Sequence, residues 1–152
     1  MPTVITYGTF DLFHAGHVRL LKRLKRLGTR LVVGCSTDEF NGIKGKSTIM
    51  PYEQRVEILT ACRYVDAVFP EQSWGQKPED IVREKADIFA MGDDWSGQFD
   101  DLSNLCQVVY LSRTKDISTT EIKQLVNARF EERLQQLRNS YAQLGDVIKS
   151  MG

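Results

Sequence analysis

Short apolar runs alternate with amphipathic stretches over most of the chain. Runs of this length are typical of buried strands, and they occupy residues 4–7, 31–35, 67–69, 88–91 and 108–111. Residues 18–27 carry apolar side chains at helical spacing, and Gly28 follows, which predicts a helix closed by that glycine. A second helix is expected from Pro51, at its first position, to about Arg63, and a third from near Pro78.

This alternation of strand and helix predicts an α/β fold. The expected architecture is a Rossmann-like, doubly wound parallel sheet of about five strands, followed by a long C-terminal helix. Ligands of such sheets bind beyond the carboxyl ends of the strands. Gly8 to His17 follows the first predicted strand, so we expect it at a binding site.

The tail differs from the rest of the chain, which suggests a domain of residues 1–123 and a helical extension of residues 124–152. Its apolar positions are spaced close to a heptad repeat, at Val126, Phe130, Leu134, Leu137, Tyr141, Leu144 and Ile148. Such a helix either pairs with a second copy or packs back on its own domain. Both remain open from the sequence, and we predict a homodimer.

Composition narrows the class of protein. The 152 residues are 41% hydrophobic, enough for one core, and the formal net charge is zero, which does not favour nucleic acid as a partner. Cys35, Cys62 and Cys106 are widely spaced and form no CxxC pair, which fits a reducing compartment. No apolar run approaches the ~20 residues of a membrane span. We expect a cytoplasmic protein with a small ligand and no membrane insertion.

The segment His14-Ala15-Gly16-His17 carries the strongest chemical signal. Two imidazoles three positions apart at a helix start, with Gly16 between them, suit an anion that the helix N-terminus already attracts. In isolation this pattern is weak, and one histidine capping a helix would explain it. Asp11 lies close upstream, where a carboxylate holds a turn or a Mg²⁺ ion beside phosphates.

A second phosphate-binding candidate precedes the tail. Ser118 to Glu121 has the pattern of a capping box, which exposes backbone N–H groups, and Arg113 adds a guanidinium suited to phosphate oxygens. Lys44 and Lys46 lie in a glycine-containing stretch, residues 41–48, expected to be a flexible loop. Lysines in such loops are most often only solvated.

Four segments together resemble a known family. They are GTFDLFHAGH at 8–17, RYVD at 63–66, MGDDW at 91–95 and RTKDISTT at 113–120. In order and spacing they are similar to the motifs of the HxGH nucleotidyltransferase superfamily, in its cytidylyltransferase branch. The resemblance covers roughly residues 4–123 and leaves the tail outside.

The resemblance implies roles for individual residues. As catalytic groups it implies His14, His17, Lys44, Lys46 and Arg113. For the nucleotide it adds Gly8, Thr9, Phe10, Asp11, Gly16, Arg63, Gly92, Asp94, Thr114, Ile117, Ser118 and Thr119. For the acceptor it implies Asp38, Lys44, Arg55, Trp74 and Lys77, and Mg²⁺ is expected near Asp11.

The implied reaction is transfer of a cytidylyl group from CTP to a small phosphorylated alcohol. Within the branch, sn-glycerol 3-phosphate is the expected acceptor, and its product would serve a teichoic-acid-like or capsular polymer. Ethanolamine phosphate, a sugar phosphate, or an inactive CTP-binding module remain alternatives. Asp116 replaces the glycine of the branch's RTxGISTT motif, so we expect either an outward-turned side chain or weaker CTP binding.

Overall fold

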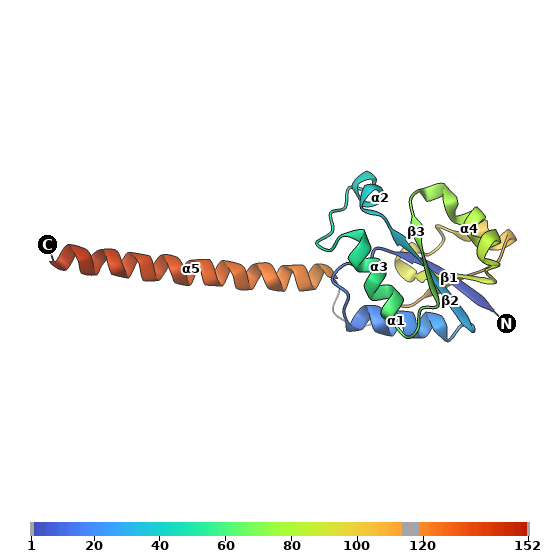
Figure 1. Cartoon of the computed structure of the whole chain (residues 1–152), viewed down its shortest axis with the longest axis horizontal. Helices are drawn as coiled ribbons and strands as arrows, with labels where there is room; N and C mark the ends of the chain where they lie inside the picture. The colour runs from blue at the N-terminus through green and yellow to red at the C-terminus, as the bar shows by residue number, and fades with distance from the viewer. Residues whose placement is uncertain (1, 114–118, 152) are drawn as a thin grey trace. The chain divides into compact units, whose positions relative to one another are not determined.

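Five parallel strands form one sheet in the computed structural model, which describes residues 2–113 and 119–151 (Figure 1). The strands are β1 (Thr3–Gly8), β2 (Arg30–Ser36), β3 (Ala67–Glu71), β4 (Ile88–Gly92) and β5 (Gln107–Leu111). Their order is β3-β2-β1-β4-β5. The chain therefore winds outward from β1, returns to β1's other side at β4, and opens a crevice at that reversal. Each predicted strand and the predicted fold class are confirmed.

Alternate residues of the central strands pack into two cores, one on each face of the sheet. Val4 and Val33 meet Leu21 of α1 (Ala15–Lys25) and Leu59 of α3 (Tyr52–Ala61). On the other face, a cluster that contains Ile5, Tyr7, Val32 and Phe89 includes Ile81 of α4 (Lys77–Glu84). These strands are buried on both faces, which explains why they read as continuous apolar runs.

The first helix ends earlier than the sequence predicts. It stops at Lys25, with Arg26 as its cap, so Gly28 does not close it. Gly28 instead allows a close backbone approach, because a Cβ there would lie 2.5 Å from the Pro2 carbonyl oxygen and 2.9 Å from a Val4 methyl group. The predicted role of Gly28 as the end of the helix is therefore wrong.

Two corrections concern the segment between β2 and β3. Residues 38–43 form a short helix, α2 (Asp38–Ile43), where the sequence suggested a flexible loop beginning at Asn41. Its N-cap is Thr37, whose hydroxyl accepts a hydrogen bond from the Phe40 N–H at 3.1 Å. Pro51 is the cap of α3 and not its first residue.

The C-terminal helix α5 spans Thr119–Met151 and belongs to a second compact unit. It is continuous across residues 123 and 124, where the sequence suggested a boundary. None of its described residues is buried, and the near-heptad apolar positions Phe130, Leu137 and Leu144 are exposed. No helix in the described ranges is both long enough and apolar enough to cross a membrane.

The carboxyl edge of the sheet gathers the polar ends of three strands. Gly8 of β1 is level with Cys35 of β2, and Ser36 is level with Glu71 of β3. The loops that follow these strands carry most of the site residues predicted in the described part of the chain. The site described next is built on this edge.

Candidate active site

The side chains of His14 and His17 accept hydrogen bonds from backbone N–H groups at the N-terminus of α1. His14 Nδ1 accepts a hydrogen bond from the Gly16 N–H at 3.0 Å, and His17 Nδ1 accepts one from the His14 N–H at 3.2 Å. This is a capping box in which imidazoles replace the usual serine and glutamate. An Nδ1 that accepts cannot carry the proton of a neutral ring, so Nε2 carries it in both histidines. The pair therefore presents two Nε2–H donors at a helix N-terminus.

Both imidazoles are neutral near pH 7. Burial lowers the pKa of His17 to about 4, and the neighbouring His14 lowers it further while Asp11 opposes the shift. Burial also lowers the pKa of His14. The His17 ring stacks on Phe13 at a centroid distance of 5.3 Å and lies 3.9 Å from that of His14. Neutral imidazoles held in this way act on an anion as hydrogen-bond donors and not as positive charges.

A strained turn delivers the histidines from the end of β1. Phe10 and Leu12 have φ angles of 55° and 48°, in the left-handed region that costs non-glycine residues about 1–3 kcal/mol each. Phe10 also explains Gly8, because a Cβ on Gly8 would lie 2.6 Å from the Phe10 ring. Turns of this kind persist only where the surroundings hold them.

Asp11, between these two residues, supplies that hold. It is buried, and its carboxylate accepts backbone hydrogen bonds from Leu12 at 3.1 Å, Ile49 at 2.9 Å and Met50 at 3.0 Å. The last two partners lie at the end of the loop that carries Lys44 and Lys46. Asp11 thus fastens the lysine loop to the histidine turn.

Arg55 also connects the histidine turn to the loop that follows α2. Its guanidinium is fully buried and donates to the carbonyl oxygens of Met50 at 3.0 Å, Thr9 at 2.9 Å and Ser36 at 2.7 Å. It also pairs with Asp38 at 2.8 Å. The Tyr52 N–H lowers the pKa of that carboxyl, and Arg55 lowers it further. The structure therefore gives Arg55 a positioning role, and its expected contact with an acceptor stays a prediction.

Two ammonium groups lie over neighbouring aromatic rings. Lys44 Nζ is 4.5 Å from the Phe40 ring centroid and 5.8 Å from that of Trp74, and Lys77 Nζ is 5.6 Å from Trp74. Burial lowers the pKa of Lys44, and Glu71 opposes that shift. Lys77 is almost fully buried and pairs with Glu71 at 3.0 Å. Phe40, Lys44, Trp74 and Lys77 form what we call the lysine–aromatic cluster.

Comparison with known proteins identifies this arrangement. Residues 5–125 match the cytidylyltransferase-like family. The chain belongs to that family. It is 54% identical over 124 residues to glycerol-3-phosphate cytidylyltransferase of Staphylococcus aureus, across 82% of this chain and 94% of that protein. It is 57% identical over 124 residues to the enzyme of the same name in Bacillus subtilis, across 82% and 96%.

A solved structure supports the fold of this cytidylyltransferase-like chain. The lipopolysaccharide core biosynthesis protein of Thermoplasma volcanium superposes with a TM-score of 0.68 at 26% identity, covering 76% of this chain and 99% of that one. The family match ends at residue 125, so most of α5 lies outside it. The resemblance seen in the sequence is confirmed over the region expected for it.

Among the other residues predicted for a cytidylyltransferase site, four end or follow strands at the carboxyl edge, Arg63 lies just before β3 begins, at the amino ends of the strands, and the rest belong to the second unit or lie outside the described ranges. Lys46 is exposed on the loop after α2, Gly92 ends β4, and Asp94 is exposed just beyond it. Arg63 follows α3 and lies 5.9 Å over the Tyr64 ring, and Arg113 is exposed after β5. Thr119 begins α5. Thr114, Asp116, Ile117 and Ser118 lie outside the described residues.

The residues near Asp11 do not build a metal site on their own. Its carboxylate is occupied by three backbone N–H groups, and the described residues contain no group of three His, Cys, Asp or Glu side chains that would hold an ion. A carboxylate used in this way acts as a structural anchor, and the Mg²⁺ expected near it stays a prediction.

Sequence reasoning missed Glu71 and Phe40. Glu71 ends β3, and the carboxyl end of a buried strand is the signal that would have found it. Phe40 is buried beneath the Trp74 ring, at a centroid distance of 5.2 Å. It reads from the sequence only as another apolar residue.

Proposed function

We infer that this chain transfers the cytidylyl group of CTP to sn-glycerol 3-phosphate, giving CDP-glycerol and pyrophosphate. In this reaction an acceptor phosphate oxygen bonds to the α-phosphorus of CTP, and the bond from that phosphorus to the bridging oxygen of the β-phosphate breaks. The observation that carries the inference is the histidine pair at the N-terminus of α1. It stands in a segment of 124 residues that is more than half identical to two enzymes named for this activity.

The chemistry asks little of the protein beyond position and charge. The acceptor phosphate is already anionic near neutral pH, so no general base is needed to activate it. The Nε2–H groups of His14 and His17 donate to oxygens of the α-phosphate and to the leaving bridge oxygen, where negative charge grows. Neutral donors fixed by backbone hydrogen bonds need no reorganisation when the charge develops.

Cations complete the proposed site. Lys44 and Lys77, in the lysine–aromatic cluster, bind the acceptor phosphate, and Lys46 from the neighbouring loop adds charge at the α-phosphate. Arg113 holds the leaving pyrophosphate, together with the residues predicted from 114 to 119. The burial that lowers the pKa of Lys44 makes an incoming anion more strongly attracted, because a poorly solvated ammonium gains more from a counter-charge.

The test is pyrophosphate release with CTP or ATP and a panel of phosphorylated alcohols. We expect turnover with CTP and sn-glycerol 3-phosphate, and little with ATP or ethanolamine phosphate. A His17→Ala variant in the same assay should lose roughly 10²-fold or more in kcat. Preferred turnover of another acceptor would overturn the substrate. CTP binding without turnover of any acceptor would overturn the activity.

The proposed reaction also includes a divalent cation and a cellular compartment. We propose that a divalent cation enters with the triphosphate, since Mg²⁺ in proteins is commonly bound through substrate phosphates with few side chains. Titrating the activity with MgCl₂ after chelation tests it, and full activity without added metal would contradict it. The three cysteines are free, which supports a cytoplasmic setting for the reaction and for supply of a glycerol-phosphate polymer.

We further propose that the chain is a homodimer paired through α5. The support is the near-heptad seam through Phe130, Leu137 and Leu144, which is self-complementary as coiled-coil seams are. Light scattering of the full chain should give twice the chain mass, and Leu137→Glu should give the monomer mass. A dimer that survives Leu137→Glu would exclude this seam as the pairing element. A wild-type monomer would exclude the dimer.

A further inference from the structure

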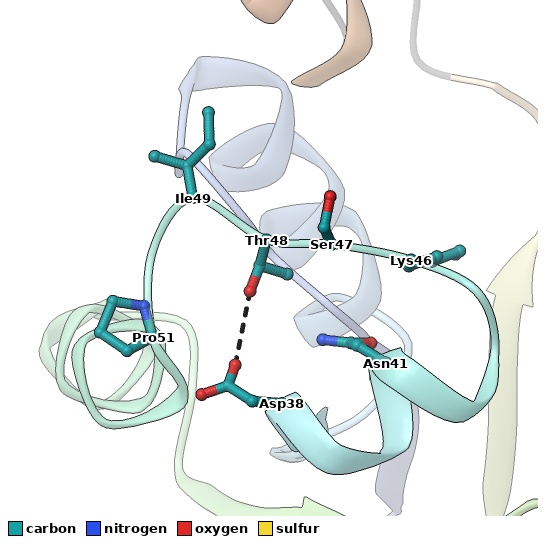
Figure 2. A pocket seen from close by; sticks show the side chains of 7 residues that line it. All are labelled: Asp38, Asn41, Lys46, Ser47, Thr48, Ile49 and Pro51. Atoms are coloured by element: carbon teal, nitrogen blue, oxygen red, sulfur yellow. Dashed lines mark hydrogen bonds between the residues drawn. The ribbon is translucent and has the colours of Figure 1, made fainter.

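A polar pocket lies between α2 and the loop of residues 46–51. Its volume is about 300 Å³, and its lining combines the Asp38 carboxylate, the Asn41 amide, and the hydroxyl-bearing residues Ser47 and Thr48 (Figure 2). Asp38 accepts the Thr48 hydroxyl at 3.4 Å, which ties one wall to the other. Lys46, Ile49 and Pro51 complete the lining. The pocket is large enough for a three-carbon polyol, and five of its seven lining residues carry side-chain groups that form hydrogen bonds.

Asn41 is the feature of this pocket that the fold does not explain. The residue is 1% exposed, and neither Nδ2 nor Oδ1 of its side chain has a hydrogen-bond partner among the described residues. A buried amide left unpaired costs the protein stability, and such groups are rare in folded chains. Figure 2 shows this side chain pointing between Asp38 and the loop of residues 46–48. The unpaired amide therefore faces the pocket.

The pocket is joined to the histidine site by two of the anchors described above. Asp11 binds the N–H groups of Ile49 and Met50, where the pocket loop ends. Arg55 connects Asp38, in the pocket wall, to the carbonyl of Thr9 at the start of the histidine turn. The N–H of Lys46 also donates to the Asn41 carbonyl at 2.8 Å. A molecule in the pocket would therefore touch the loop that carries Lys46.

The chemistry of an unpaired amide decides which group it suits. A hydroxyl both donates and accepts, so it satisfies Oδ1 and Nδ2 together, whereas an ammonium only donates and an alkyl group does neither. Asp38 is already paired with Arg55, which leaves little of its charge to attract a cation. The pocket therefore fits a neutral hydroxylated group better than an amine or a hydrocarbon.

We propose that Asn41 binds a hydroxyl of the acceptor's glycerol group and thereby selects glycerol phosphate over phosphorylated alcohols that lack it. The proposal rests on the proposed function and adds a specificity residue to it. Asn41 touches only the part of the acceptor that does not react. Its loss should therefore affect discrimination between acceptors much more than the chemistry of transfer.

The test compares sn-glycerol 3-phosphate with propyl phosphate, which lacks both hydroxyls, by kcat/KM for pyrophosphate release at saturating CTP. Asn41→Ala should lower kcat/KM for glycerol phosphate by about tenfold or more, because a substrate hydroxyl loses its partner. The value for propyl phosphate should change by less than about twofold. Asn104→Ala, at an exposed position beyond β4, is the matched control and should change neither value.

A stability measurement separates recognition from a structural role. An amide that awaits a ligand destabilises the free protein, so Asn41→Leu, which keeps the branch at Cγ and replaces the amide by methyl groups that extend into the pocket, should melt at or above the wild-type temperature without substrate and still lose discrimination. Equal losses for both acceptors, or a lower melting temperature with unchanged discrimination, would make Asn41 a structural residue and overturn the proposal. Wild-type enzyme that uses propyl phosphate as well as glycerol phosphate would overturn it while leaving cytidylyl transfer intact. No turnover with any acceptor would overturn both.

Discussion

Asp11→Asn removes one oxygen from the carboxylate that joins the histidine turn to the lysine loop. Depending on the amide's orientation, the variant loses the bond to Ile49 or the bonds to Leu12 and Met50, and it turns N–H groups toward N–H groups. A hydrogen bond to a charged, buried acceptor contributes about 1.5–3 kcal/mol. We therefore expect Asp11→Asn to lower the free energy of unfolding by about 2–4 kcal/mol.

Urea denaturation followed by circular dichroism measures this loss. Asp101→Asn, at an exposed position, is the control and should stay within about 0.5 kcal/mol of wild type. A loss of that small size for Asp11→Asn would refute the anchoring role. Activity gives a second readout: kcat should fall while the Mg²⁺ concentration for half-maximal activity stays unchanged. Rescue of Asp11→Asn by added Mg²⁺ would instead identify Asp11 as a metal ligand.

A buried histidine, a buried ion pair and a closely packed glycine each give a further prediction. The pKa of His17 is lowered to about 4, whereas a histidine in the unfolded chain titrates near 6.5, so unfolding takes up a proton between these pH values. The free energy of unfolding should therefore fall as the pH drops from about 6.5 towards 4. His17→Gln should flatten this pH dependence when it is measured by urea denaturation from about pH 4.5 to 7. Lys77→Met leaves Glu71 buried without its cation and should lower the free energy of unfolding by about 3–5 kcal/mol. The added change Glu71→Gln should largely restore that free energy. An unchanged free energy of unfolding in Lys77→Met would exclude a buried charge pair. Gly28→Ala should cost about 1–3 kcal/mol through its contact with Pro2, whereas Gly42→Ala, with open space around it, should not destabilise; equal effects would remove the close-approach argument.

The sheet was predictable because burial on both faces leaves a continuous apolar run in each strand. The family motifs likewise located the histidines at the correct sheet edge. The six-residue helix α2 was not predicted, since it is too short for a periodic pattern and contains Gly42. Its cap, Thr37, was the available signal.

The features of the site that the sequence did not predict depend on contacts between distant segments. Asp11 is held by backbone N–H groups 38 and 39 residues away, which no local pattern indicates, and the Mg²⁺ expected beside it stays a prediction. Arg55 is similar: a charged residue on a helix suggests solvent or ligand, and only the fold brings three carbonyl oxygens around it. The sequence allowed one histidine to cap the helix, but it did not indicate that both histidines form a capping box, because caps are normally recognised by serine, threonine or acidic residues.

The most direct test of the account is ³¹P NMR of CTP and sn-glycerol 3-phosphate incubated with the purified chain and Mg²⁺. The account predicts that the CTP and glycerol phosphate resonances are replaced by those of a diphosphate diester, CDP-glycerol, and pyrophosphate. It predicts no such conversion over the same time with a His14→Ala, His17→Ala variant. Inorganic phosphate as the product, no conversion by the wild type, or equal conversion by the double variant would contradict it.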